Sequence, residues 1–133
     1  GVPTETRRFS ALGAWAGDVF HTRQISCQNP EASPDGQPRV ATAQVRQALA
    51  NLDKLLQSQG LTRSEIAVLE VFIVQGRTAE LWNGFGGSGG IRDVVVEYFD
   101  RRPPVVKVYP LVTQEHSGVA VAAIAQKSAE QLS

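Results

Sequence analysis

Residues 41–59, with the sequence ATAQVRQALANLDKLLQSQ, decide the fold of this chain. Apolar residues recur along this stretch at intervals of three and four, which places their side chains on one face of an α-helix. Gly60 follows, at the position where a left-handed residue commonly ends a helix. The stretch therefore predicts a long amphipathic helix, and such a helix needs a sheet on which to bury its apolar face.

Strand-like segments flank this helix on both sides. Residues 9–16 and 18–25 are expected to form two strands joined by a turn at Gly17-Asp18. The polar residues 26–39, rich in proline and glycine, predict a loop that leads to the helix. Residues 66–74, IAVLEVFIV, have the β-branched and aromatic composition of a largely buried strand.

The second half of the chain predicts another helix and two more strands. Apolar residues at helical spacing indicate a helix over residues 91–99, which Pro103 and Pro104 end. Residues 105–112 and 118–125 predict the last two strands. The resulting order is β-β-α-β-α-β-β, an α+β fold with both helices packed on one face of the sheet.

Length and composition describe one ordinary globular domain over residues 1–133. Lys and Arg together number 13, as do Asp and Glu, so the chain lacks the basic excess that nucleic-acid binding usually needs. We therefore expect no nucleic-acid partner. No run of 18 consecutive apolar residues and no leader-like apolar segment occurs, so we expect no membrane partner and a cytoplasmic location.

Few residues suited to metal or nucleophilic chemistry are present. A single cysteine, Cys27, and two histidines, His21 and His116, cannot supply a zinc set or a Ser/His/Asp triad, so we expect neither metal nor cofactor. Glu115 and His116 suit proton transfer but fall in a predicted turn. Residues 84–89, GFGGSG, match G-x-G-x-x-G without a preceding strand. They form either a flexible insert or a loop whose N–H groups hold an anion.

Two segments carry a resemblance to a known family. Residues 22–26, TRQIS, follow the predicted hairpin, and residues 46–52, RQALANL, lie on the long helix. They are similar to the Ser-Gly-Gln-Ile-Pro strand end and the Gln-x-x-x-Leu-x-Asn-Leu helix of the Rid family, the YjgF-type proteins that include enamine/imine deaminases. Residues 65–74, 97–99 and 121–125 also resemble the family pattern. The resemblance implies a chorismate-mutase-like architecture and a homotrimer with ligand clefts between neighbouring subunits.

Two polar groups of the deaminases have no counterpart here. In the family, an arginine after the proline that follows the second helix grips the substrate carboxylate, and a glutamate on the last strand orients the attacking water. This chain has Val105 after its prolines, and Ala120 and Ala122 on the last strand. A lost charged contact of about 1.5–3 kcal/mol should weaken 2-imino acid binding by about one to two orders of magnitude.

The remaining cations near the expected cleft are the candidates for ligand binding. Arg23 stands where the family motif has glycine, with Thr22 and His21 beside it, and is either a replacement carboxylate anchor or an arginine that faces solvent. Arg102 and Arg92 are further candidates. We expect a small, anionic ligand.

Two functions follow from the resemblance. One is a divergent Rid-type enzyme that deaminates or isomerises a reactive enamine, imine or related unsaturated metabolite. The other is a trimer that binds a ligand or protects proteins without catalysis, which Ala120 and Ala122 favour. An RNA-cleaving role, as some relatives are labelled, conflicts with the neutral charge.

Overall fold

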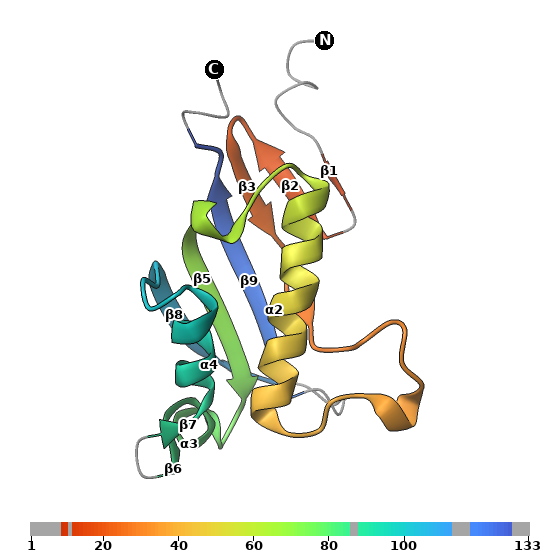
Figure 1. The fold of residues 1–133 in the computed structure, drawn as a ribbon, viewed down its shortest axis with the longest axis vertical. Helices are drawn as coiled ribbons and strands as arrows, with labels where there is room; N and C mark the ends of the chain where they lie inside the picture. The colour runs from red at the N-terminus through yellow and green to blue at the C-terminus, as the bar shows by residue number, and fades with distance from the viewer. Residues whose placement is uncertain (1–8, 11, 86–87, 113–117, 129–133) are drawn as a thin grey trace.

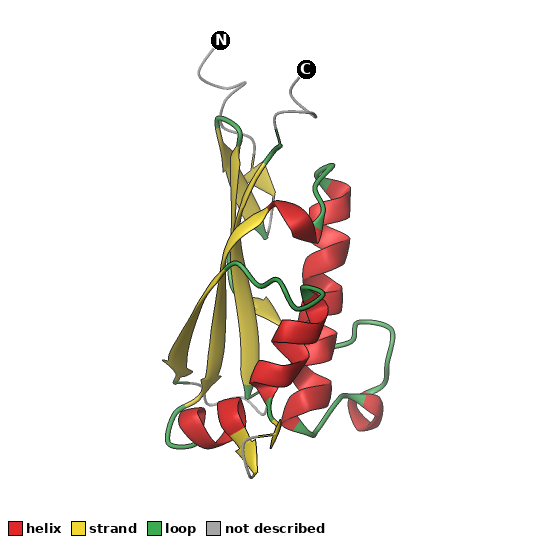
Figure 2. Ribbon diagram, turned by 60° about the vertical axis from the view of Figure 1, so that its left-hand side comes forward, coloured by secondary structure: helices red, strands yellow, loops and turns green. Residues whose placement is uncertain are grey.

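The structure is a computed structural model that describes residues 9–10, 12–85, 88–112 and 118–128. It consists of a twisted sheet with helices on one face, as the two ribbon views show (Figure 1, Figure 2). The sheet has seven strands in the order β1-β2-β3-β9-β5-β8, with β4 also paired to β9. The expected α+β class and the placement of the helices on one face are confirmed.

The N-terminal strands are shorter than the sequence predicts. The structure has β1 (Phe9–Ser10), β2 (Gly13–Ala16), β3 (Val19–Thr22) and β4 (Ile25–Ser26) in place of two continuous strands. The hairpin at Gly17-Asp18 is confirmed, with Gly17 at a φ of 64°. The second strand breaks after Thr22, because its pairing with β9 ends at His21–Ile124, although the Arg23 backbone N–H still donates to the Leu12 carbonyl at 2.8 Å in the β2–β3 register.

The long helix α2 spans Ala41–Ser58, as predicted to within one residue. Val45, Ala48 and the four leucines of this helix are buried, and the helix lies along the length of the sheet (Figure 1). Gly60, at a φ of 74°, ends the helix, and the Leu61 N–H returns to the Leu56 carbonyl at 2.8 Å. A capping box of Thr62 and Glu65 then leads directly into β5 (Ile66–Val74), which has the predicted bounds.

A third helix, α3 (Thr78–Asn83), was not predicted. Its six residues are too few to show a helical period, and its start is held by Thr78 Oγ1, which donates to the Ile73 and Val74 carbonyls. The short hairpin of β6 (Gly84–Phe85) and β7 (Ser88–Gly89) follows. Helix α4 (Ile91–Tyr98) begins directly after it and agrees with the predicted second helix.

The last two strands take different places in the sheet. β8 (Val105–Leu111) pairs in parallel with β5 at the sheet edge, where Pro110 costs no ladder hydrogen bond to a further strand. β9 (Val119–Gln126) lies between β3 and β5 and is antiparallel to both. The most C-terminal strand is therefore central, and its small residues lie under α2.

Candidate functional site: the open face of the sheet

The two faces of the sheet have different surroundings. On β9, Val119, Val121, Ala123 and Ala125 belong to the core beneath the helices. Ala120 and Ala122 alternate with them and point the other way, because successive side chains in a strand face opposite sides. Figure 2 shows α2 and α4 on one side of the sheet, with the short α3 at its lower end.

We call this second side the open face. Strand register and alternation place the following described residues on it: Ala14, His21, Ser26, Val68, Glu70, Phe72, Val105, Lys107, Tyr109, Ala120, Ala122 and Ile124. Most are apolar. Val105 and Tyr109 on the edge strand β8 are 59% and 37% exposed, whereas Ala120 and Ala122 on the central strand β9 are buried. A largely apolar sheet face of this kind marks an interaction surface.

Side chains on the open face lie in rows that cross the strands. One row contains Ala122, Glu70 and Lys107, which are direct partners on β9, β5 and β8. The next row on one side contains Ala120, Phe72 and Tyr109, whose two rings stack with centroids 5.5 Å apart. The row on the other side contains Ile124, Val68 and Val105. A carboxylate and an ammonium group thus lie between two apolar rows.

Three of the residues predicted for a site lie together at the end of β3. His21 is exposed on the open face, opposite Ile124. The half-buried Thr22 uses its hydroxyl within the fold, because Oγ1 accepts from the Ala123 N–H at 2.9 Å and donates to the Arg23 carbonyl at 2.8 Å. The Arg23 side chain is exposed. Only His21 and Arg23 therefore present their side chains to solvent.

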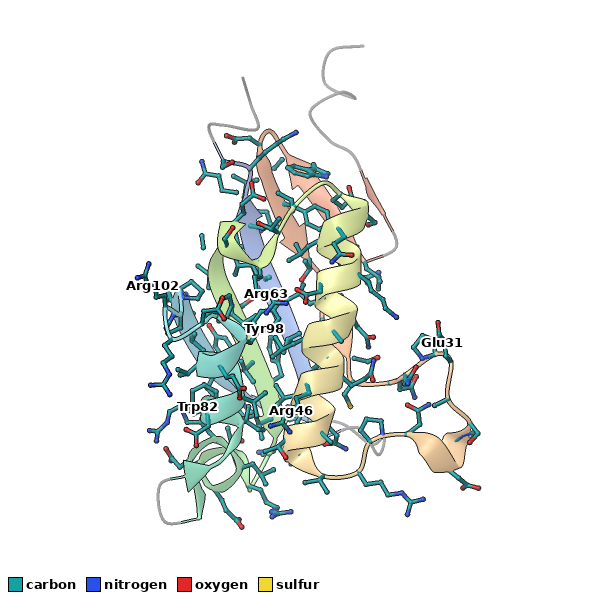
Figure 3. All side chains as sticks on the ribbon, viewed as in Figure 1. Glu31, Arg46, Arg63, Trp82, Tyr98 and Arg102 are labelled. Carbon is teal, nitrogen blue, oxygen red and sulfur yellow. The ribbon has the colours of Figure 1, made fainter. Side chains whose placement is uncertain are left out.

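The other two predicted residues lie elsewhere. Arg92 is exposed in the first turn of α4, and Arg102 is exposed beyond the end of that helix, where its N–H donates to the Phe99 carbonyl. Figure 3 shows Arg102 at the outer side of the molecule, next to β8. Two strands, β9 and β5, separate β3 from β8, so a single chain does not bring Arg102 and Arg23 together.

The helical segment RQALANL has a structural explanation. Asn51 Nδ2 donates to the Ser26 and Gln28 carbonyls at 2.9 and 2.8 Å, while its Oδ1 accepts from Gln47 Nε2 at 2.9 Å. The amide of Asn51 therefore attaches the segment after β4 to α2. These contacts give the motif a structural role in holding the segment after β4 against α2.

A polar cluster connects α2 and α4 on the opposite side of the sheet. Tyr98 Oη donates to Asp53 Oδ1, and Arg63 pairs with Asp53 Oδ2 at 2.9 Å. The Arg63 guanidinium lies 4.3 Å from the centroid of the Tyr98 ring and donates to the Tyr98 carbonyl, and Figure 3 shows the two residues side by side between α2 and α4. Burial, and then the hydrogen bond to Asp53, raise the pKa of the Tyr98 phenol.

Other reactive groups do not form a site in the described residues. Cys27 is buried under the sheet, and burial raises the pKa of its thiol. The described part of the chain contains no cluster of three or more His, Cys, Asp or Glu side chains arranged to hold a metal ion. None of its helices is long and apolar enough to cross a membrane. Glu115 and His116 lie outside the described residues.

Sequence reasoning did not bring Glu70 and Lys107 together. The only signal was a single charge in each of two otherwise apolar strands, at residues 66–74 and 105–111. Without the parallel pairing of β5 with β8, nothing in the sequence places these two charges beside each other.

Comparisons with known proteins identify the fold. No family model and no curated protein matches the sequence. YyfA from Yersinia pestis, a Rid family protein, is 18% identical, with a TM-score of 0.69 over 89% of this chain and 87% of that chain. TdcF from E. coli with bound serine is 20% identical, with a TM-score of 0.69 over 91% and 90%. The YjgF gene product from E. coli is 18% identical, with a TM-score of 0.69 over 90% and 89%.

These structures share nearly the full length of the chain at low sequence identity, so the likeness concerns the fold. This likeness of folds agrees with the order of helices and strands and with the sequence segments that resemble the family. The chain therefore has the fold of the Rid, or YjgF-type, proteins.

Proposed function

We propose that this chain is a divergent Rid-type protein that forms a homotrimer and takes a small, reactive metabolite in clefts between its subunits. The observation that carries the proposal is the largely apolar open face, on a fold shared with Rid proteins. Covering this face with further copies would remove exposed side chains such as Val105 and Tyr109 from water.

The chemistry we propose is the hydrolytic deamination or isomerisation of an enamine, imine or related unsaturated compound. The serine bound to TdcF supports a ligand of amino-acid size. Ala120 and Ala122 offer no group for proton transfer, and Val105 cannot bind a carboxylate. We therefore propose little or no activity on simple 2-imino acids. The alternative, a trimer that binds its ligand without catalysis, is favoured by the same alanines.

Arg23 is our first candidate among the arginines for an anionic ligand, because it is exposed next to the open face and stays charged at any working pH. Thr22 and His21 accompany it, and Arg102 and Arg92 are alternatives that a neighbouring subunit would have to supply. If Arg23 contacts the ligand, Arg23→Ala should weaken the binding of a carboxylate ligand by about 1.5–3 kcal/mol. The binding of the corresponding amide should not change. Calorimetry with one carboxylate and its amide tests this, and equal losses for both would remove Arg23 from the site.

Two measurements together test the proposed function. One is turnover of 2-iminobutyrate generated in solution, and the other is thermal stabilisation by a panel of carboxylates and amino acids. Slow turnover of another imine or enamine supports the enzyme, and stabilisation without turnover supports the binding protein. A monomer that responds to none of these compounds would contradict both. A rate equal to that of an ordinary Rid deaminase would instead point to Arg102 as the carboxylate anchor.

A further inference from the structure

The sequence contains one Asn-Gly dipeptide, at residues 83 and 84. Its three asparagines, at positions 29, 51 and 83, are followed by proline, leucine and glycine. An asparagine loses its side-chain amide when the backbone nitrogen of the next residue attacks the side-chain carbon. Pro30 has no N–H for this attack and the side chain of Leu52 hinders it, whereas Gly84 has no Cβ. This chemistry therefore singles out Asn83.

The dipeptide lies at the end of helix α3, at the lower end of the molecule (Figure 1). Asn83 is exposed, and Gly84 follows it at a φ of 74°. Asn83 Nδ2 donates to the Ala79 carbonyl at 3.0 Å, and the Gly84 N–H donates to the Glu80 carbonyl. Both reacting groups are thus engaged while the helix is closed. Reaction requires the end of α3 to open, so that the Gly84 nitrogen can turn towards the Asn83 side chain.

Helix α3 is a weakly held element. None of its six residues is buried, and a helix of this length has little stability of its own. Leu81 and Trp82 are only half-buried against the core, and Thr78 Oγ1 joins the start of the helix to two carbonyls at the end of β5. Segments with few buried contacts open locally, without unfolding of the whole protein. Opening of α3 is therefore the route by which the dipeptide becomes reactive.

We propose that Asn83 is a site of intramolecular deamidation that is controlled by the opening of α3. The Gly84 nitrogen gives up its proton to water and attacks Asn83 Cγ, so that a new C–N bond closes a five-membered succinimide ring. The bond from Cγ to Nδ2 breaks, and Nδ2 takes up a proton and leaves as ammonia. Water then adds to one of the two ring carbonyls and opens the ring to aspartate or to isoaspartate at residue 83.

The isoaspartate product does not fit the packing at this position. Its main chain runs through the side-chain carbon, which adds one backbone atom between residues 83 and 84. A Cβ atom at Gly90 would lie 2.5 Å from the Gly84 nitrogen and 2.6 Å from the Asn83 carbonyl carbon, so Gly90 already fills the space against this backbone. A longer main chain must therefore shift the start of α4. The aspartate product keeps the chain length and adds only a charge.

Mass spectrometry of the protein during storage at mildly alkaline pH tests the site. We expect the peptide that contains Asn83 to gain the mass of an amide-to-acid exchange, while the peptides that contain Asn29 and Asn51 keep their mass. An isoaspartate methyltransferase with labelled S-adenosylmethionine counts the isoaspartate that forms. Asn83→Gln should keep its mass and accept no label, because its ring closure would need a less accessible six-membered ring.

Hydrogen exchange tests the role of α3, because exchange and deamidation both need a free Gly84 N–H. The factor by which folding slows deamidation, relative to the urea-unfolded chain, should match the protection of the Gly84 amide against exchange. Thr78→Val removes the hydroxyl contacts at the start of α3 and should speed deamidation by about 5- to 30-fold. Thr22→Val is the matched control, since it acts at the end of β3, and should leave the rate unchanged.

Three results would overturn the proposal. The first is an Asn83 peptide that keeps its mass in both the wild type and Thr78→Val, over a period many times longer than the urea-unfolded chain needs to convert. The second is equal acceleration by Thr78→Val and Thr22→Val, which would show that the reaction follows global unfolding. The third is deamidation of Asn29 or Asn51 as fast as that of Asn83. None of these results bears on the function proposed above, which does not involve Asn83.

Discussion

At the residue scale, Thr22 shows how one side chain continues a sheet where the backbone leaves it. The ladder between β3 and β9 ends at His21–Ile124 and resumes between β4 and β9 at Ile25–Val121. Between these points the Thr22 hydroxyl accepts the Ala123 N–H at 2.9 Å. The hydroxyl therefore has a structural role, whether or not it also contacts a ligand.

Replacing Thr22 tests this role. Thr22→Val keeps the shape of the side chain but leaves the Ala123 N–H unpaired next to the core, so the free energy of unfolding should fall by about 1–3 kcal/mol. Thr22→Ser should retain most of the stability because it keeps the hydroxyl. Urea denaturation measures both variants, and hydrogen exchange should show faster exchange of the Ala123 amide in Thr22→Val. Equal stability of the valine and serine variants would contradict this role.

Tyr98 makes a second prediction at this scale, which depends on pH. Its folded pKa is raised by burial and by Asp53, so the phenol in the folded protein stays protonated when the unfolded one, with a pKa of about 10, ionises. The stabilisation of the folded protein by the protonated Tyr98 phenol is complete below pH 10 and is lost as the pH rises above that value. Tyr98→Phe should lower the free energy of unfolding by about 1–2 kcal/mol at pH 7.

The same variant should also lose stability less steeply between about pH 10 and 11 than the wild type does. Denaturant unfolding across this range measures the slope. An unchanged slope would show that the phenol does not stay protonated in the folded protein.

At the element scale, the hairpin of β6 and β7 determines where α4 begins. Gly90 precedes α4 and lies against the backbone at the end of α3, where a Cβ atom would come within 2.4 Å of the Trp82 carbonyl oxygen and 2.5 Å of the Gly84 nitrogen. The Gly89 N–H donates to Asp93 Oδ2 at 2.9 Å and closes the first turn of α4. Close contact between α3 and the start of α4 thus requires glycine at residue 90.

We expect Gly90→Ala to destabilise the fold by about 1–3 kcal/mol, because backbone atoms must move to admit the methyl group. Gly36→Ala is the matched control, since its new Cβ would meet nothing closer than 3.4 Å. This control should change stability by less than about 0.5 kcal/mol. Thermal unfolding of both variants measures the difference, and similar melting temperatures would show that α3 and α4 do not pack this closely.

At the scale of the whole molecule, the open face predicts assembly. Two exposed valines provide a matched comparison: Val105 is 59% exposed on the open face, and Val40 is 66% exposed before α2. Val105→Glu should dissociate the proposed trimer because a carboxylate cannot be covered there without a partner. Val40→Glu should leave the trimer intact. Sedimentation equilibrium measures the masses, and a wild type with the monomer mass of 14.3 kDa would contradict assembly.

The sequence by itself determined the elements whose burial is periodic. The apolar period of α2, the composition of β5 and the glycine at residue 60 each act through neighbours in the chain, so they predicted bounds close to the observed ones. The six-residue helix α3 shows no such period, and its start depends on a threonine hydroxyl that reaches back to β5. Sequence periodicity could not reveal it.

Only the tertiary structure decided which residues share a surface. His21 and Arg23 were accessible to sequence reasoning because a motif places them at a strand end. Glu70 and Lys107 are 37 positions apart in the sequence and meet because α4 carries the chain back to lie parallel to β5. Long-range strand pairing depends on the packing of the whole sheet. The local sequence therefore does not predict that these two charges lie side by side.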